Sequence, residues 1–325
     1  MYKIQYQEQI PVRLDKFLAN NIKELSRSQI QDLIVNGQIS IENKIMTKKN
    51  KIIFKGQIVN ISFEKTKKDI YMAKKNNKEF NLEIIFEHKD FLIINKPAGL
   101  LVHKTNNQNS FSVVEILKEK YPDIKGVSEP LELRNDGNNQ DRDGIVHRID
   151  RDTSGLLIIA RNMNAFYYFK NLFKERKIIK KYITLVYGNL KTETGIINFP
   201  IARSKVNHTK RIAVKNNRDI DFYNKKRISL TEYKVIQRLK NYTLLEVILH
   251  TGRTHQIRVH FQSINHPIFG DKLYAGKIDQ NNSILNRQFL HCSELSFQYL
   301  GKQFEFKIDL PEELSRTLNS LKLAY

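Results

Sequence analysis

The chain has 325 residues, which is long enough to bury a large core and fits two domains of unequal size. Its formal net charge of +21 favours a polyanionic partner, and nucleic acid explains this charge better than a membrane, because neither a long apolar span nor a signal-type apolar segment follows Met1. The single cysteine, Cys292, excludes an intramolecular disulfide and a cysteine-rich zinc site, and indicates a reducing, cytoplasmic setting for a small buried thiol.

Residues 11–63 predict a small, separable module of two helices and a small sheet. Apolar residues recur at helical spacing from Val12 to Leu18, and Ser26 to Gln29 form a capping box that opens a second helix. Residues 39–41 and 59–63 then alternate between apolar and polar, as half-buried strands do. The segment that follows, residues 64–81, is rich in Lys, Asn and Glu and predicts a flexible linker, which serves either as a tether or as a plain spacer.

A larger domain is predicted from residue 82 onward. Residues 91–94 are four consecutive apolar residues that predict a core strand, and Lys96 to Gly99 predict a turn after it. An amphipathic helix follows and ends at Pro122. The polar segment 126–144 reads as an exposed insertion, and its partial likeness to a calcium loop fails because the bidentate Glu is missing.

The segment from Val146 to Gly155 places one carboxylate, Asp150, among arginines. The apolar run that follows, Leu156 to Ile159, predicts a buried strand, so Asp150 lies where a loop enters a sheet. A rigid strand fixes the base of such a loop while the carboxylate oxygens stay accessible, which suits a reactive group. The alternative is a structural Asp that makes a turn and pairs with Arg148 or Arg151.

The C-terminal half combines core elements with basic surface. Residues 165–173 carry aromatic side chains at helical spacing that predict core packing, and residues 181–187 alternate as a strand that contains Tyr182. Residues 203–227 are strongly basic and form either an RNA-contacting loop or a solvated hairpin rim. Residues 254–265 predict a helix with Thr254 as N-cap.

Three ordered segments together resemble the RluA-type pseudouridine synthases, which isomerise uridine in RNA. They are Ile93 to His103, His147 to Gly155, and Thr251 to His260. The N-terminal pattern resembles the αL RNA-binding module of a ribosomal protein. Residues 285–292 resemble the corresponding segment of the RluC branch, which modifies bacterial large-subunit ribosomal RNA, although Gln298-Tyr299 stands where relatives often carry His-Pro.

This resemblance implies an α+β fold. A small αL RNA-binding domain (1–63) and a linker (64–81) would precede a catalytic domain (82–325) with a mixed, mainly antiparallel sheet flanked by helices and loops. It further implies that residues 96–99 support the catalytic loop. The implied site residues are the catalytic carboxylate Asp150, its partner Arg258, the base contact Tyr182, and Arg148 and Thr153, which shape the loop at the substrate.

The resemblance also sets the expected partners. Arg13, Lys16 and Arg27 would meet RNA phosphates, which supply affinity and register but little sequence choice. The reaction gains and loses no atoms, so no cofactor and no metal is expected, and His255 and His260 lack zinc-protease spacing. The expected partner is large-subunit ribosomal RNA, with no membrane partner, and nothing in the sequence demands more than a monomer. Alternatives are a transfer-RNA synthase, an RNA N-glycosidase and a non-catalytic ribosome-assembly factor.

Overall fold

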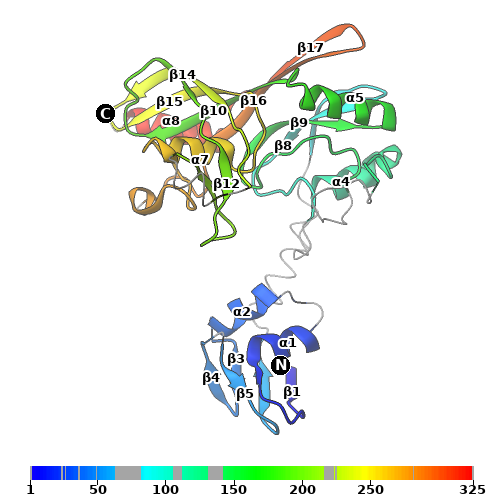
Figure 1. Ribbon diagram of the computed structural model, residues 1–325, viewed down its shortest axis with the longest axis vertical. Helices are drawn as coiled ribbons and strands as arrows, with labels where there is room; N and C mark the ends of the chain where they lie inside the picture. Colours follow the sequence, from blue (N-terminus) through cyan, green and yellow to red (C-terminus); the bar gives the residue numbers. More distant parts are fainter. Residues whose placement is uncertain are drawn as a thin grey trace. The chain divides into compact units, whose positions relative to one another are not determined.

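The computed structural model describes two compact units (Figure 1). The described residues are 2–22, 25, 27–35, 37–48, 50–62, 82–104, 112–130, 142–215, 223, 225–280 and 282–323. Those up to residue 62 form the first unit, and those from residue 82 form the second. The predicted linker, residues 64–81, lies outside the described residues. Within the described ranges, no helix is both long enough and apolar enough to cross a bilayer.

The first unit contains two helices and a small sheet, as predicted. Its elements are β1 (Tyr2–Gln5), β2 (Val12–Arg13), α1 (Leu14–Asn21), α2 (Arg27–Val35), β3 (Ile39–Ile41), β4 (Lys44–Met46), β5 (Ile52–Ile53) and β6 (Ile58–Ile61). The four-stranded sheet has the order β1-β6-β3-β4, and β2 pairs with β5. Apolar faces of both helices and of the sheet form one core, with Leu14, Ile30 and Val59 fully buried. Ser26 and Asn36, two of the predicted helix-boundary residues, lie outside the described residues.

The second unit is built on one nine-stranded sheet. Its strands are β7 (Glu83–Glu87), β8 (Phe91–Lys96), β9 (Ser154–Ala160), β10 (Ile179–Tyr187), β11 (Thr194–Ile197), β14 (Thr231–Leu239), β15 (Tyr242–Leu249), β16 (Leu290–Tyr299) and β17 (Lys302–Lys307). The order is β11-β14-β15-β10-β16-β9-β8-β7, with β17 beside β16. Of these pairings only β16 with β9 is parallel, so the predicted mixed, mainly antiparallel sheet is confirmed.

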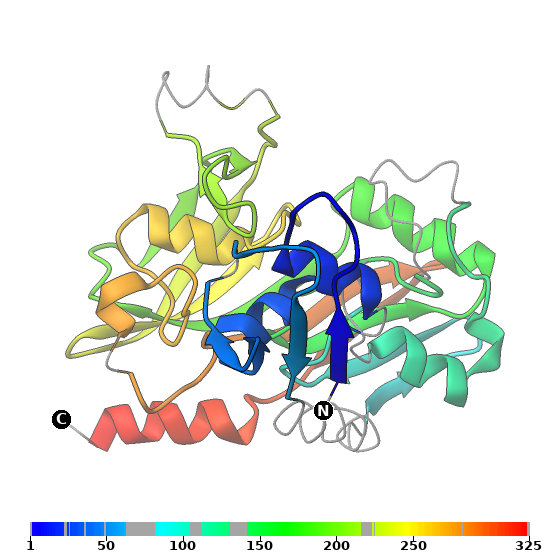
Figure 2. The ribbon, with the colours of Figure 1, turned by 90° about the horizontal axis from the view of Figure 1, so that it is seen from below.

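Helices flank this sheet at both ends. They are α4 (Val113–Lys120), α5 (Met163–Lys174), α7 (Gln256–Ser263), α8 (Glu312–Leu323) and the short 3-10 helices η1 (Pro122–Ile124) and η3 (Gly276–Asp279). Figure 1 shows α7 and α8 beneath β10, β14 and β15, while α4 and α5 flank β8 and β9. In Figure 2, which looks from below, α7 and α8 lie well apart. The basic segment from residue 203 contains a hairpin of β12 (Ile201–Arg203) and β13 (Arg211–Ala213).

An aromatic cluster joins α5 to the sheet. The Phe91 ring on β8 lies 5.3 Å from Phe169 on α5 and 5.7 Å from Phe297 on β16, centroid to centroid. Both contacts are edge-on, the arrangement that aromatic quadrupoles favour. The predicted core role of the aromatic stripe on α5 is therefore confirmed for Phe169, whereas Phe173 is only half-buried.

The first unit is organised around one buried carboxylate. Asp15 is fully buried and accepts hydrogen bonds from Arg13 (Nε to Oδ1, 3.0 Å), Arg27 (Nη2 to Oδ2, 2.8 Å) and Gln31 (Nε2 to Oδ2, 2.8 Å). Burial alone would raise the pKa of Asp15, but these hydrogen bonds and the Arg27 charge lower it to about 2. The side chains of Arg13 and Arg27 remain 43% and 47% exposed, and that of Lys16 is exposed. Asp15 thus fixes two of the predicted phosphate contacts in place.

Replacing this carboxylate should destabilise the first unit in a pH-dependent way. The pKa of Asp15 is depressed on folding, so its contribution is present above about pH 4 and is lost as the pH falls toward 2. A shift of this size corresponds to about 2 kcal/mol. Asp15→Asn should therefore reduce hydrogen-exchange protection of α1 and α2 in the full chain at pH 7, and this difference should shrink below pH 4. Lys16→Gln, which changes an exposed charge on the same helix, is the control, and equal protection of Asp15→Asn and wild type at pH 7 would refute the assignment.

Candidate active site

Asp150 lies in the loop that enters β9. Its backbone carbonyl accepts a hydrogen bond from the Thr153 N–H at 3.1 Å, which closes a tight turn. The Thr153 hydroxyl is buried and accepts a hydrogen bond from Gln288 Nε2 at 3.1 Å. Thr153 is therefore hydrogen-bonded at both its backbone and its side chain within this loop, while the Asp150 side chain stays 18% exposed.

A buried lysine holds the same loop from β8. Lys96 is fully buried, and its ammonium donates to the carbonyls of Pro97 (2.6 Å), Leu100 (2.9 Å) and Arg151 (2.8 Å). Burial lowers the pKa of Lys96 to about 7, although the nearby charge of Asp152 acts in the opposite direction. Three carbonyl acceptors require three N–H donors, which only the ammonium form of Lys96 supplies. The segment after β8 thus supports the Asp150 loop through the backbone, which agrees with the role expected from the sequence.

Arg287 also supports the loop, through a second set of hydrogen bonds. Its Nη1 donates to the Asp152 carbonyl at 3.2 Å, and its Nη2 donates to the Ser154 hydroxyl at 3.3 Å. Glu313 on α8 pairs with Arg287 Nε at 2.8 Å, and the Ser154 hydroxyl also contacts His291 Nδ1 at 2.9 Å. The sequence pointed to residues 285–292 only through their resemblance to the RluC branch, and it did not indicate that this arginine binds the loop.

A close approach of β9 to β16 connects the Asp150 loop to β10. The parallel pairing of β9 with β16 joins Gly155 to Cys292, and Cys292 in turn pairs with Tyr182 on β10. Gly155 has a φ of +119°, and a Cβ there would lie 2.2 Å from the Cys292 carbonyl oxygen. Only glycine allows this approach. Gly155 follows Asp150 by five residues. Only β16 therefore separates the strand of Tyr182 from the strand that the Asp150 loop enters.

The helix that carries Arg258 begins later than the sequence predicts. The prediction that Thr254 is the N-cap is wrong. The N-cap residue is His255, which adopts the left-handed conformation with a φ of 58° and makes no side-chain capping hydrogen bond. The Gln256 side chain instead accepts the Arg253 N–H at 3.0 Å. Because α7 starts at Gln256, Arg258 occupies its first turn rather than the second turn that a start at Thr254 would give.

Arg258 joins two carboxylates that are distant in sequence. Its Nη1 lies 3.1 Å from Asp150 Oδ2, while its Nε and Nη2 bind both oxygens of Asp271 at 2.7 and 2.9 Å. Burial lowers the pKa of Arg258, but hydrogen bonds and charges from Asp271 and Asp150 outweigh burial and raise it. Asp271 is fully buried and also accepts backbone N–H groups of Leu273 and Tyr274. The fully buried Asp271, which the sequence analysis missed, therefore orients the Arg258 fork toward Asp150.

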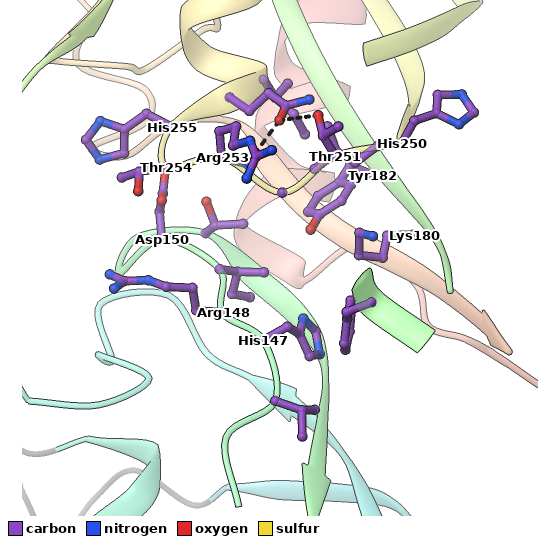
Figure 3. Close-up of a pocket in the computed structure, with 18 of the residues that line it drawn as sticks. His147, Arg148, Asp150, Lys180, Tyr182, His250, Thr251, Arg253, Thr254 and His255 are labelled. Atoms are coloured by element: carbon purple, nitrogen blue, oxygen red, sulfur yellow. Dashed lines mark hydrogen bonds between the residues drawn. The ribbon is translucent and has the colours of Figure 1, made fainter. Parts of the chain in front are cut away.

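The predicted site residues of the second unit line one cavity of about 780 Å³ (Figure 3). These residues are Arg148, Asp150, Thr153, Tyr182 and Arg258. Figure 3 shows Asp150 and Arg148 on one side and Tyr182 on the other. Tyr182 is only 4% exposed, and burial together with contact to Cys292 raises its pKa, so the phenol stays neutral.

Arg148 and its neighbour His147 have different environments. Arg148 is exposed on the cavity wall, and its Nη1 lies 3.4 Å from His103 Nε2. His147 Nε2 accepts the Ile158 N–H at 2.9 Å, and its ring lies against Phe173. Burial and the nearby Lys180 lower the pKa of His147 to about 3. The neutral His147 is therefore scaffold, whereas Arg148 presents a charge at the cavity.

His255 and His260 are both hydrogen-bonded within the fold. His255 Nδ1 lies 2.8 Å from the Tyr274 hydroxyl, and the Tyr274 ring lies 5.0 Å from the Arg258 guanidinium carbon. His260 contacts the Thr231 hydroxyl at 2.8 Å and the Phe199 carbonyl. No group of three or more His, Cys, Asp or Glu residues suited to a metal ion occurs in the described part of the chain.

Comparisons with known proteins match both units. The family model described as RNA pseudouridylate synthase matches residues 90–263, and the S4 domain model matches residues 12–59. The chain is 32% identical to an uncharacterized RNA pseudouridine synthase, YlyB, of Bacillus subtilis (strain 168), over 97% of this chain and 96% of the relative. It is also 32% identical to the ribosomal large subunit pseudouridine synthase D of Yersinia pestis, over 97% and 93%.

A solved structure shares the fold of the larger unit. Human RNA pseudouridylate synthase domain containing 4 aligns with a TM-score of 0.57 and 22% sequence identity, covering 78% of this chain and 97% of that chain. These matches confirm the predicted α+β fold, with an S4 module at the position of the expected αL domain.

Removing Asp271 should leave a buried arginine only partly paired. Asp271→Asn should destabilise the second unit by about 3–5 kcal/mol, because breaking one partner of a buried pair leaves an uncompensated charge. Denaturant titration followed by tyrosine circular dichroism would measure this loss. The double variant Arg258→Met/Asp271→Asn removes the stranded charge and should be less destabilised than the sum of the two single variants. A loss below about 1 kcal/mol in Asp271→Asn would contradict the orienting role.

Proposed function

Since the chain belongs to the RNA pseudouridylate synthase family and carries an N-terminal S4 domain, we propose that Asp150 is the carboxylate with which this isomerase converts uridine to pseudouridine. The observation that carries this proposal is the Asp150–Arg258 ion pair in the wall of the cavity. A fixed cation favours the ionised carboxylate and aims it, because the guanidinium cannot release its proton. Asp271 and the loop contacts hold both groups before substrate arrives.

The reaction breaks the bond between ribose C1′ and uracil N1 and joins C1′ to uracil C5. An ionised Asp150 acts on the ribose, either as a nucleophile or as a base, while the glycosidic bond opens. Arg258 remains protonated and keeps the Asp150 oxygens in position. No redox step occurs, since the product is an isomer of the substrate.

Tyr182 and Arg148 would receive the target nucleotide. A uridine within folded RNA must leave its stack to reach Asp150, and a pocket with an aromatic wall holds such an extruded base. Tyr182 supplies that wall as a neutral phenol. Thr153 fixes the turn that presents Asp150, and the exposed guanidinium of Arg148 is placed to meet the RNA as it enters the cavity.

We further propose large-subunit ribosomal RNA as the substrate. Several relatives are named ribosomal large subunit pseudouridine synthase D, and residues 285–292 resemble the RluC branch, which also modifies that RNA. Arg13, Lys16 and Arg27 of the S4 domain would bind phosphates without reading sequence. Action as a monomer in the bacterial cytoplasm, where such RNA is made, completes this proposal. Transfer RNA is the alternative substrate, and an assembly factor that only grips RNA is the alternative function.

Asp150→Asn should abolish the reaction while leaving RNA binding intact. The amide cannot act as a nucleophile or base, so the single-turnover rate should fall by about 10³-fold or more. The measurement is chemical mapping of pseudouridine after purified protein meets unmodified large-subunit RNA, without added metal or nucleotide. Asp152→Asn is the matched control, because this carboxylate is 49% exposed in the same loop and does not line the cavity.

Each alternative gives a different outcome in this assay. Unchanged RNA mass with new pseudouridine supports isomerisation, whereas loss of uracil would indicate an N-glycosidase. Pseudouridine formed only in transfer RNA would show that transfer RNA, and not large-subunit ribosomal RNA, is the substrate. Tight binding with no product on any RNA would favour the assembly factor, and normal activity of Asp150→Asn would remove this carboxylate from the mechanism.

A further inference from the structure

Lys180 is a buried cation without a carboxylate partner in the described part of the chain. It lies on β10 and is only 8% exposed. Its ammonium has a long hydrogen bond of 3.4 Å to the Ile178 carbonyl and lies 5.3 Å from the centre of the Phe173 ring. By contrast, Arg258 binds two carboxylates and Lys96 binds three carbonyls. Lys180 is thus a poorly compensated buried charge at the cavity.

Among the residues that the structure describes, the titratable groups nearest Lys180 carry no negative charge. Burial lowers the pKa of Lys180 itself, because desolvation disfavours the ammonium. Burial lowers the pKa of His147 to about 3 and raises that of Cys292 to about 12, so both are neutral near pH 7. Tyr182 is neutral as well. Since an unpaired buried charge costs stability, its presence beside a cavity indicates an anionic ligand.

The position of Lys180 relates it to the proposed base contact. Lys180 and Tyr182 are alternate residues of one strand, both are buried, and both line the cavity, so they share one face of the sheet. Figure 3 shows Lys180 beside Tyr182, with Asp150 across the cavity. A nucleotide whose ribose meets Asp150 and whose base lies on Tyr182 would therefore direct an edge of that base toward Lys180.

Building on the proposed function, we propose that Lys180 is a further catalytic residue, which donates a hydrogen bond to a carbonyl oxygen of uracil as the base leaves with negative charge. When the C1′–N1 bond breaks, its electron pair passes to the uracil ring and is shared by the O2 and O4 oxygens. The C1′–C5 bond then forms, C5 loses its proton and N1 gains one, so atoms and charge balance. A buried cation at the place where charge develops stabilises that step.

An RNA phosphate is a less suitable anion for this lysine. The lysines of α5 that line the same cavity, Lys170 and Lys174, are exposed, as Arg148 is, and can follow a sugar-phosphate chain at the surface. Lys180 is instead only 8% exposed, and it lies against the Phe173 ring, near His147 and beside Tyr182 (Figure 3). The depth of Lys180 therefore favours contact with the base.

The test compares uridine RNA with the same RNA carrying 5-fluorouridine at the target. Fluorine withdraws electrons and stabilises the uracil anion, so cleavage of the C1′–N1 bond then depends less on an external cation. In single-turnover reactions of the full chain, Lys180→Met should slow loss of uridine by about 10²-fold or more. The defect should be at least tenfold smaller for loss of 5-fluorouridine, and Lys180→Arg should recover part of the rate.

RNA affinity and protein stability separate this role from others. Lys180→Met should keep the dissociation constant for RNA within about twofold and should be no less stable than wild type, since a desolvated charge is removed. Lys174→Met is the matched control for a surface phosphate contact. Equal defects on both RNAs, or a loss of affinity that accounts for the loss of rate, would overturn the proposal.

The outcome for wild type separates the two proposals. An active wild type with an equally active Lys180→Met removes only Lys180 from the mechanism. If the wild type forms pseudouridine in no RNA, the proposed function is wrong, and the role of Lys180 that rests on it is wrong as well. If Lys180→Met does not fold, Lys180→Gln provides the same comparison with a polar side chain. An equal loss of rate on uridine RNA and on 5-fluorouridine RNA in Lys180→Gln would likewise overturn the proposal.

Discussion

The site depends on one guanidinium held between two carboxylates. The Arg258 side chain is only 9% exposed, and it binds both Asp150 and the fully buried Asp271. Those carboxylates lie 108 and 13 residues away along the chain. Because each charge would be costly without the others, the Asp150 loop, α7 and the turn at Asp271 form a single unit that is complete only in the folded protein.

Backbone contacts make the Asp150 loop rigid. Lys96 and Arg287 donate to the carbonyls of Arg151 and Asp152, the two residues after Asp150. Carbonyls are present whatever the side chain, so this support fixes the path of the loop rather than the chemistry of its residues. A carboxylate held in this way needs little reorganisation when substrate arrives, which is the usual advantage of a preorganised site.

Local patterns predicted the elements but not the supports of the site. The buried strands predicted from the apolar runs in β8 and β9 are confirmed, because a strand that is covered on both faces requires apolar residues at consecutive positions. The prediction of Thr254 as the N-cap is wrong, because His255 is the N-cap and adopts a left-handed conformation that no local sequence pattern indicates. Asp271, by contrast, was missed because its partner is Arg258, which only the tertiary fold brings near.

The two buried cations that line the cavity, Arg258 and Lys180, differ in a way that matches the two halves of a nucleotide. Arg258 is paired with Asp150 and Asp271 before substrate arrives, so these two carboxylates already neutralise its charge and it attracts a further anion only weakly. Lys180 has no such partner among the described carboxylates, and its field acts on the opposite wall, beside Tyr182. A paired cation suits the ribose side, where a carboxylate must stay ionised, and an unpaired one suits the base side, where negative charge appears only during the reaction.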